Sequence, residues 1–453
     1  MRILLWHGYL LRGSGSNIYT ANVAKVWRRQ GHDVVLMCQE RHPEALDFVD
    51  RYGECDEDNL DVRLVGRDPV AAAGSCDVVR PHIGRILPVY VYDEYEGFEA
   101  KRFVDLDEGE LQAYIDRNIA AMEMVIARYQ PDAIITGHEV MGPFVAAQAC
   151  ASTGTRYIAK LHGSALEYAV KVQDRYKDYA AQGLGGAHRV VGGSRYMVEE
   201  AARHIPGWRD RAVVVNPGCD IDLFMPNRAR RNVPPIAGYV GKFIVMKGVH
   251  NLLAALPATT TELRAVIVGY GGFDEQLRAI ARALRLGDLE KLVDISRTEG
   301  LGDVETFLDA LDDPEGYRAK AHSIEVEFTG RLEHGPLARV LPTWDLLVVP
   351  SILAEAFGMV AAEAAACAVL PIVPRHSGIG EVGSALEEAL GTPGLLTYDP
   401  SAPVEGIASR IDELLALNDA DRAELATTAA EVARGRWSWE RVANDLLALA
   451  TSH

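Results

Sequence analysis

The chain has 453 residues, of which 48% are hydrophobic and 24% charged, and its net charge is −18 at pH 7. This length predicts two or three domains with cores of ordinary size. The negative charge argues against broad binding to nucleic acid or to anionic lipid, although it leaves room for a local basic patch and so for peripheral membrane contact. The sequence has no apolar stretch long enough to span a bilayer.

The amino-terminal sequence MRILLWHG leads directly into what reads as a buried strand. It lacks the long apolar region and small-residue cleavage site of a secretion signal. The six cysteines are scattered, without CxxC or zinc-finger spacing, which is typical of reduced thiols. We therefore expect a cytoplasmic protein.

The first half of the chain opens with a βαβ pattern. Arg2–Trp6 predicts a strand, about Ile18–Gln30 a helix and Val34–Met37 a second strand, which is the Rossmann-type arrangement. The loop before the helix carries glycines, among them Gly15. Its spacing is not GxGxxG, so a nicotinamide-dependent dehydrogenase is only a weak alternative.

Further along this half, three features are candidates for functional roles, one of them in an acceptor site. The aromatic and acidic piece Tyr90–Phe98 is suited to lining a site for a polyhydroxylated molecule, although most such loops only face solvent. Strands expected at Asp132–Thr136 and Arg156–Leu161 are followed by His138 and His162. A lone histidine is more often structural than catalytic, so both interpretations stay open at this point.

A linker and a second Rossmann-like half follow. Pro226–Pro235 has the proline and charge content of a linker. Ile236–Val240 predicts a strand, and Lys242 and Lys247 come between this strand and the next helix, a placement suited to holding a departing diphosphate. Part of the mostly helical stretch that comes later, Asp288–Tyr317, is interpreted as an insertion of unknown use.

The most informative stretch is LLVVPSILAEAFGMVAAEAAACAVLPIVPRHSGIGEV, which begins at Leu346. It predicts a buried strand, a loop that carries Glu355, an alanine-rich helix from about Gly358 that carries Glu363, and another strand. The amides in the first turn of such a helix have no partners within the helix, so a phosphate binds there readily. The two glutamates can then converge on one ligand beyond the end of the strand.

The pattern P-S-x3-E-x-F-G-x4-E-A-x-A, followed by H-S-G-I-G-E, resembles the donor-binding signature of the retaining E-x7-E glycosyltransferases, the glycosyltransferase family 4-like or group 1 family. This resemblance implies an α/β fold of the GT-B type, with two Rossmann-like domains, a deep interdomain cleft and a C-terminal helix that crosses back to the first domain. The expected domains are residues 1–225 with 437–453 for the acceptor, and residues 233–436 for the nucleotide-sugar donor.

The resemblance also implies roles for individual residues. Glu355 is expected to position the transferred sugar, Glu363 to hold the ribose hydroxyls, Lys242 and Lys247 to neutralise the leaving diphosphate, and His162 to face the sugar. The remaining residues expected to bind substrate are Gly15, Ser16, Asn17, Gly241, Arg331, Leu332, Phe357, Gly358, Met359 and Val360. The Asp-x-Asp pattern at residues 220–222 lacks the context of a metal motif, so neither a metal nor a cofactor is expected.

The resulting prediction is a retaining transfer of a sugar from a nucleoside diphosphate sugar, with UDP or GDP favoured, to an acceptor hydroxyl. The acceptor is a sugar, a polyol, another small molecule or a lipid-linked glycan. Two alternatives in the same architecture are a sugar phosphorylase and a sugar-nucleotide epimerase. Another is a protein that binds a sugar nucleotide without turning it over.

Overall fold

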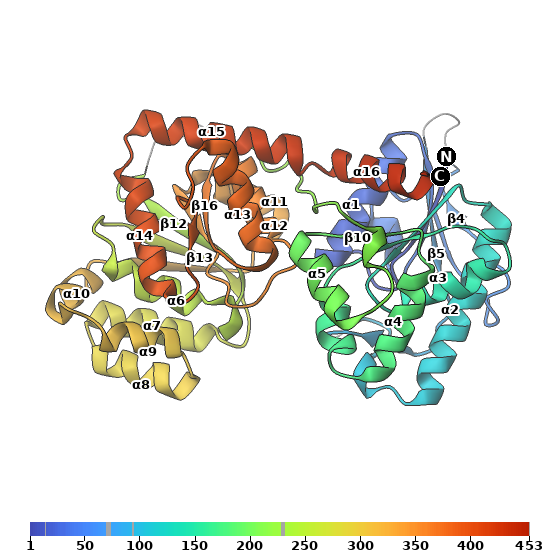
Figure 1. Cartoon of the computed structure of the whole chain (residues 1–453), viewed down its shortest axis with the longest axis horizontal. Coiled ribbons are helices and arrows are strands. Elements are labelled where there is room, and N and C mark those ends of the chain that lie inside the picture. The colour runs from blue at the N-terminus through green and yellow to red at the C-terminus, as the bar shows by residue number, and fades with distance from the viewer. Residues whose placement is uncertain (14, 69–73, 93–94, 228–231, 453) are drawn as a thin grey trace. The chain divides into compact units, whose positions relative to one another are not determined.

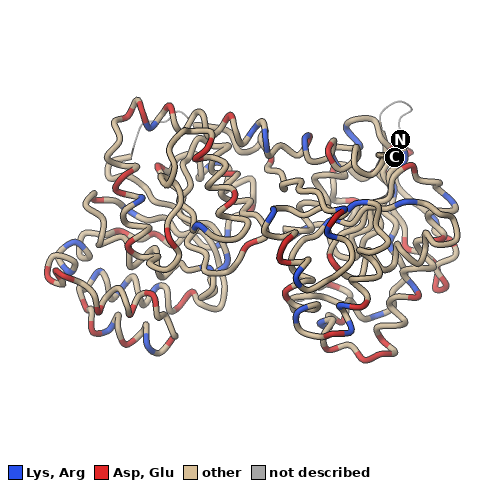
Figure 2. Tube along the Cα trace, in the orientation of Figure 1, with Lys and Arg blue, Asp and Glu red and all other residues tan. Residues whose placement is uncertain are grey.

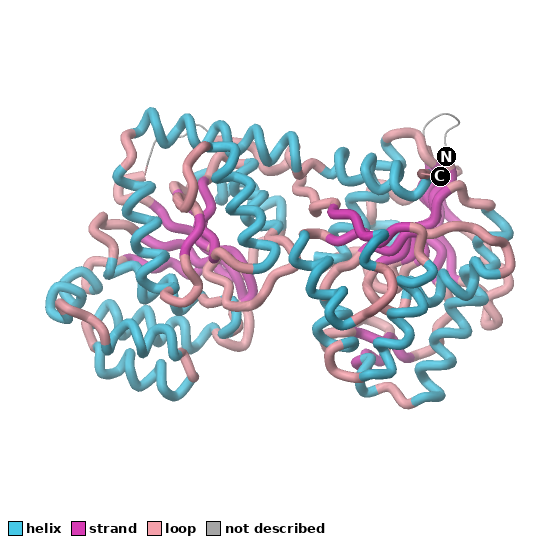
Figure 3. Tube along the Cα trace, in the orientation of Figure 1, coloured by secondary structure: helices cyan, strands magenta, loops and turns pink. Residues whose placement is uncertain are grey.

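The computed structural model describes residues 1–13, 15–68, 74–92, 95–227 and 232–452 (Figure 1). The chain divides into two compact units, Met1–Pro217 with Trp439–His453, and Gly218–Ser438. In each unit, helices surround a predominantly parallel sheet (Figure 3). Ser14, residues 93 and 94 of the Tyr90–Phe98 piece, and residues 228–231 of the expected linker lie outside the described residues.

The first unit contains a nine-stranded sheet in the order β11-β10-β9-β8-β1-β2-β5-β3-β4. Neighbouring strands are parallel except β3 and β4, and a separate parallel pair is formed by β6 and β7. The strands are β1 (Arg2–Trp6), β2 (Asp33–Met37), β3 (Arg51–Glu54), β4 (Val65–Gly66), β5 (Ser75–Arg80), β6 (Ile86–Val89), β7 (Glu99–Arg102), β8 (Ala133–Gly137), β9 (Ile158–Lys160), β10 (Arg189–Gly192) and β11 (Ala212–Val214). The helices are α1 (Gly15–Arg29), α2 (Glu108–Tyr129), α3 (Gly142–Ala151), α4 (Asp174–Gly186), α5 (Arg195–His204) and α16 (Trp439–Thr451).

Amphipathic spacing and capping explain how these helices form. In α1, Tyr19, Val23, Val26 and Trp27 are buried, and this spacing places them on one face of a helix. Helix α2 begins with a capping box. The Asp107 side chain accepts a hydrogen bond from the Glu110 amide, and the Asp107 amide donates to the Glu110 side chain.

The last helix, α16, packs within the first unit although it lies at the far end of the chain. Trp439, Val442, Ala443 and Leu446 are buried in the same core as α1. The indole Nε1 of Trp27 donates a hydrogen bond to the Ala443 carbonyl oxygen at 3.0 Å. This contact satisfies a buried indole N–H and ties the two helices together.

The second unit contains a six-stranded, fully parallel sheet in the order β14-β13-β12-β15-β16-β17. Its strands are β12 (Ile236–Lys242), β13 (Arg264–Tyr270), β14 (Glu325–Gly330), β15 (Leu346–Val348), β16 (Leu370–Pro374) and β17 (Thr397–Tyr398). The helices are α6 (Val249–Ala255), α7 (Asp274–Leu286), α8 (Leu289–Glu299), α9 (Gly302–Asp309), α10 (Pro314–Ala321), α11 (His334–Val340), α12 (Met359–Ala366), α13 (Ser377–Leu390), α14 (Pro403–Ala416) and α15 (Asp419–Arg436). This is the strand order of the dinucleotide-binding Rossmann fold.

The packing boundary between the units lies eight residues before the position expected from the sequence. Cys219 and Phe224 are buried in the core of the second unit, and the Cys219 amide donates to the Trp437 carbonyl oxygen. The second boundary lies between Ser438 and Trp439, two residues beyond the expected one. Proline and charge mark the linker in the sequence, whereas buried side chains set the boundary in the structure.

The stretch in which an insertion was expected, Asp288–Tyr317, is helical, as predicted, and contains α8, α9 and the first half of α10. It belongs to the second unit because Leu292, Val304, Phe307 and Tyr317 are buried in that core. The Tyr317 hydroxyl donates to the Ala254 carbonyl oxygen on α6 at 2.8 Å. The insertion is therefore an integral part of the packing of this unit.

Acidic and basic residues are interspersed along the helices of both units (Figure 2). The net charge of −18 is consequently spread over the protein and is not concentrated in a single segment. Within the described ranges, no helix combines the length and the apolar character needed to cross a membrane.

Candidate functional site

The sheet of the second unit places two predicted residues together at its topological switch point. Strands β12 and β15 are neighbours, and the next strand of the chain lies toward one edge of the sheet after β12 and toward the other edge after β15. Open parallel sheets bind ligands at such a point, beyond the carboxyl ends of the strands. Lys247 follows β12 and Glu355 follows β15. Lys247 Nζ lies 2.9 Å from Glu355 Oε1, so the cation and the carboxylate form one site.

The two loops that carry this pair are tied to each other. The amides of Ile352 and Leu353 both donate to the Met246 carbonyl oxygen, at 3.0 and 2.9 Å. Gly248 has a φ of +67°, and a Cβ atom there would lie 1.9 Å from the Pro350 carbonyl oxygen. Only glycine fits this position, so the sequence Lys247-Gly248 fixes the lysine against the Glu355 loop.

The H-S-G motif after β16 holds the backbone of Glu355. The Glu355 amide donates to Ser377 Oγ at 3.0 Å, and the Gly378 amide donates to the Glu355 carbonyl oxygen at 2.8 Å. A Cβ atom on Gly378 would lie 2.3 Å from the Ala356 carbonyl oxygen. The imidazole Nε2 of His376 donates to the Ser351 carbonyl oxygen at 3.0 Å. The motif is therefore a support for the carboxylate loop.

Helix α12 presents an uncapped amino terminus beside this loop. Gly358 is its N-cap residue, has a φ of +123° and provides no side-chain cap. The amides of Met359 and Val360 belong to the first turn, where helical N–H groups lack intrahelical acceptors. Phe357 is buried with its ring 5.8 Å from that of Trp437. This packing fixes the start of the helix as a potential anion site.

Glu363 lies on α12, and Glu355 lies in the loop before it, as the sequence predicts. The glutamate on the helix is only 8% exposed, and its Oε1 lies 3.6 Å from Nε2 of His334. The two carboxylates thus have different basic partners, a lysine for Glu355 and a histidine for Glu363.

The other predicted residues of the second unit differ in their surroundings. The Arg331 guanidinium lies over the Tyr270 ring at 5.0 Å and forms a 2.9 Å ion pair with Glu333. Leu332 packs against the core of the unit. Lys242 is exposed, and its side chain makes no hydrogen bond or ion pair with any residue that the structure describes. Of the two lysines, the structure thus brings only Lys247 to Glu355. Gly241, beside Lys242, is partly buried.

In the first unit, three histidines gather at the carboxyl ends of adjacent strands. His7 follows β1, His138 follows β8 and His162 follows β9. The ring centroids of His7 and His138 are 5.6 Å apart, and those of His138 and His162 are 4.9 Å apart. Burial lowers the pKa of His7 to about 4 and the pKa values of His138 and His162 well below the usual 6.5. All three imidazoles are therefore neutral at pH 7.

His7 organises the start of α1. Its Nε2 donates to Asn17 Oδ1 at 2.8 Å, and its Nδ1 lies 3.1 Å from Thr20 Oγ1. The Asn17 amide group in turn donates to the Arg12 carbonyl oxygen at 2.6 Å. Asn17, a predicted substrate residue, therefore uses its side chain within the protein. Gly15 is exposed and Ser16 is partly exposed.

Two buried charged residues stand beside the histidines. Glu139 Oε1 accepts a hydrogen bond from the Gly163 amide at 2.8 Å, and burial raises the pKa of its carboxyl group. Lys160 is 1% exposed, its Nζ lies 5.1 Å from the centre of the Tyr19 ring, and burial lowers its pKa to about 7. Within the described part of the chain, His138 Nε2 and Glu139 Oε2 have no hydrogen-bond partner. These two atoms are buried polar groups that the described part of the chain leaves unsatisfied.

Sequence reasoning missed several of these residues as parts of a site. His7 and Glu139 follow predicted strands, and this position is a usable signal because the carboxyl ends of parallel strands form one edge of a sheet. The sequence signal for Lys160 is a charged residue at the end of an otherwise apolar predicted strand. His334 carries no such signal, since its contact with Glu363 depends on how α11 and α12 pack.

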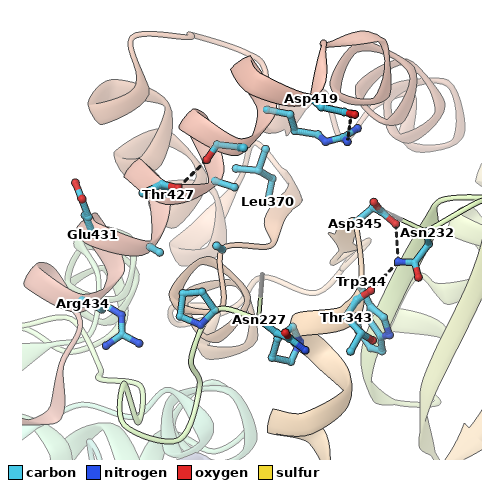
Figure 4. Close-up of a pocket in the computed structure, with 17 residues that line it drawn as sticks. Asn227, Asn232, Thr343, Trp344, Asp345, Leu370, Asp419, Thr427, Glu431 and Arg434 are labelled. Carbon is cyan, nitrogen blue, oxygen red and sulfur yellow. Dashed lines mark hydrogen bonds and ion pairs between the residues drawn. The ribbon is translucent and has the colours of Figure 1, made fainter. Parts of the chain in front are cut away.

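A cavity of about 700 Å³ in the second unit is separate from these residues (Figure 4). It lies where β15 and β16 begin and is bounded by α15, with Asp345, Leu370 and Thr427 in its lining. Glu355 and Glu363 follow the opposite, carboxyl end of β15. This cavity therefore does not coincide with the predicted site.

Comparison with known families supports the resemblance seen in the sequence. Residues 14–218 match the glycosyl transferase 4-like domain, and residues 311–432 match glycosyl transferases group 1. The second match contains Glu355, Glu363 and the H-S-G motif. The chain belongs to the group 1 glycosyltransferase family.

Curated relatives of this family member include D-inositol 3-phosphate glycosyltransferases. Those of Mycobacterium leprae and Rhodococcus opacus are 28% identical over 278 residues and 26% identical over 288 residues. The alignments span 56% and 59% of this chain, and 56% and 53% of the relatives. The chain thus matches about half the length of these curated relatives.

Solved GT-B glycosyltransferase structures share the fold over nearly the whole chain. Sucrose-phosphate synthase from Thermosynechococcus elongatus is 18% identical with a TM-score of 0.60, and 99% of this chain aligns with 98% of that one. HepE of Anabaena, in complex with UDP, is 15% identical with a TM-score of 0.62 and the same coverage. The fold of this family member is GT-B, with two α/β domains built on parallel sheets.

Proposed function

We propose that this chain is a retaining glycosyltransferase that moves a sugar from a nucleoside diphosphate sugar to an acceptor hydroxyl. The observation that carries the proposal is the Lys247–Glu355 pair, with 2.9 Å between Nζ and Oε1, at the switch point of a Rossmann-type sheet. A parallel sheet of this kind binds nucleotides beyond the carboxyl ends of its strands.

Each residue of this site has a distinct task in the proposed reaction. Negative charge develops on the departing diphosphate, and Lys247 together with the first-turn amides of α12 supplies preorganised positive charge there. Lys242 is exposed and adds a second cation. Glu355 positions the hydroxyls of the transferred sugar, and Glu363 accepts hydrogen bonds from the ribose. No metal is required in this scheme, because cationic side chains and helix amides perform the neutralisation.

The second unit is proposed to bind the donor, and the first unit the acceptor. Neutral His162 faces the transferred sugar. A uridine nucleotide is the favoured donor because the structurally similar HepE has been solved with UDP. A polyol or sugar acceptor is favoured because relatives in sequence are D-inositol 3-phosphate glycosyltransferases.

The decisive experiment has two stages. Thermal unfolding is first measured with UDP, GDP, ADP and dTDP, since a ligand that binds only the native state raises the melting temperature. The nucleotide with the largest shift then defines the nucleotide sugars to be tested with myo-inositol, its 3-phosphate and simple sugars. The anomeric configuration of the product is read by NMR. A product with inverted configuration, or the absence of any nucleotide-dependent shift, contradicts the proposal.

The same assay separates the alternatives. Inorganic phosphate as acceptor would yield a sugar phosphate from a phosphorylase, and incubation without acceptor would yield an epimerised nucleotide sugar from an epimerase. Nucleotide binding without any product would identify a binding protein.

A further inference from the structure

His334 is the first residue of α11 and lies against the side chain of Glu363 on α12. Its Nε2 is 3.6 Å from Glu363 Oε1. The contact is sheltered on one side, because Glu363 is 8% exposed and the fully buried ring of Phe224 packs edge-on to the imidazole at 6.0 Å. The His334 side chain itself is 44% exposed. An ion pair in such surroundings is screened less than one on the open surface.

The charges around His334 favour its protonated form. The close approach of the Glu363 carboxylate, 3.6 Å away, is the largest cause of the raised pKa of His334. The charges of Glu333 and Asp220 act in the same direction, while burial opposes them. Glu333 is shared with Arg331. Arg434 of α15 is the basic group nearby, and its charge acts on Cys219 and Cys367 beside Glu363.

We propose that His334 is a positioning residue that holds the Glu363 carboxylate by Oε1 and so presents Oε2 to the ribose hydroxyls of the nucleotide. The inference rests on the proposed function, in which Glu363 binds the ribose. A carboxylate has about four acceptor positions on its two oxygens. It can therefore receive the imidazole N–H and two hydroxyls at once, and the histidine need not leave when the nucleotide binds.

Two consequences follow from this geometry. Without His334, the Glu363 side chain regains rotamer freedom, and this entropy has to be lost again when the ribose binds. A protonated His334 holds the Glu363 carboxylate more firmly, so protonation favours binding of the ribose. Because the coupling between two ligands is reciprocal, binding of the ribose also favours protonation of His334. Nucleotide affinity should therefore fall as the pH rises through the raised pKa of His334.

The test is a thermodynamic cycle that combines substitutions in the protein with removal of the ribose hydroxyls from the nucleotide. Dissociation constants for UDP and 2′,3′-dideoxy-UDP are measured by calorimetry for the wild type, His334→Ala, His334→Gln and Glu363→Gln. GDP and its dideoxy analogue replace them if GDP is the tighter ligand. The wild type is expected to prefer the ribose form by about tenfold. In His334→Ala this preference should fall to about threefold or less, with the affinity for the dideoxy nucleotide unchanged.

The amide of His334→Gln keeps an N–H donor but does not titrate. We expect it to restore part of the preference for ribose and to remove the decline in UDP affinity between pH 6 and 8.5. It also serves as the folded control if the alanine variant has a lower melting temperature.

The possible results distinguish the positioning role of His334 from the ribose-binding role of Glu363. Full retention of the ribose preference in both His334 variants overturns the role of His334 and leaves the donor site intact. Equal losses for both nucleotides in His334→Ala also overturn it, because they indicate a general structural effect. If the wild type shows no preference, or if Glu363→Gln retains it, then the ribose role of Glu363 itself is wrong and the proposed donor site falls with it.

Discussion

Lys247 Nζ lies 2.9 Å from Glu355 Oε1, and the two side chains are 25% and 16% exposed. The cation proposed for the diphosphate and the carboxylate proposed for the sugar are thus held in place by each other. Each of them is oriented by a partner that has its own task in the reaction. Removing either one is consequently expected to affect both the diphosphate and the sugar of the proposed donor.

The first prediction concerns this pair. Glu355→Gln and Lys247→Ala should each lower kcat/KM by at least about 100-fold, because each removes preorganised charge from the site where charge develops. The unfolding free energy should change by only about 1 kcal/mol, as expected for a partly exposed ion pair. Steady-state kinetics and urea unfolding measure the two effects.

The matched control is Lys291→Ala, which removes an exposed lysine on α8 of the same unit. It should leave both activity and stability near the wild-type values. Near-normal turnover of either pair variant would show that the pair has no catalytic role.

Local structure around this pair was predictable from the sequence. The apolar run before Pro350 and the alanine-rich stretch after Gly358 predicted β15 and α12 nearly to the residue, because burial on both faces and strong helix formers act over short segments. The placement of Glu355 in a loop and Glu363 on a helix followed from these elements.

The contacts that complete the sites were not predictable from the sequence in the same way. His334 and Glu363 are distant in sequence and meet only because α11 and α12 pack on the same sheet. Glu139 reaches the Gly163 amide because β8 and β9 are neighbours. Periodicity indicates which residues are buried but not which strands adjoin, so such partners depend on the topology. The first boundary between the units was missed for a similar reason, since the burial of Phe224 depends on the tertiary core.

The second prediction concerns the hydrogen bond from His7 to Asn17. His7→Ala should reduce the unfolding free energy by about 1–3 kcal/mol, because it leaves the buried Asn17 Oδ1 without its donor. Asn17→Ala should cause a similar loss, and the double variant should lose less than the sum of the two. A strictly additive double variant would show that this hydrogen bond does not couple the residues. His32→Ala, at a partly exposed histidine, is the control.

The third prediction is a pH dependence of stability that originates in the first unit. The pKa of His7 is lowered to about 4, whereas the unfolded chain titrates near 6.5. Between these values the unfolded state binds more protons, so the unfolding free energy rises with pH. The contribution of His7 to this free energy is fully present above about pH 6.5. For His7 alone the loss on acidification amounts to at most about 3 kcal/mol, and His138 and His162 act in the same direction.

Urea unfolding of the wild type and of His7→Gln between pH 4 and 7.5 measures this dependence. The glutamine variant keeps a donor toward Asn17 but does not titrate, so its stability should decline less steeply below pH 6.5. Identical slopes for the two proteins would show that His7 is not buried in its neutral form.

The last prediction concerns Lys160, which is 1% exposed and forms no ion pair within 4.0 Å among the described residues. Its pKa is lowered to about 7, below the value near 10.4 of an unfolded lysine. The unfolded state therefore binds more protons between these values, and the unfolding free energy should rise as the pH increases from 7 toward 10.

Lys160→Met keeps the apolar stem and removes the buried charge. It should stabilise the protein at pH 7 by at least about 1 kcal/mol and flatten the rise at higher pH, while the surface control Lys291→Met changes neither. A loss of stability in Lys160→Met would instead indicate that the ammonium compensates the buried carboxylate of Glu139, and in that case the double variant with Glu139→Gln should recover part of the loss.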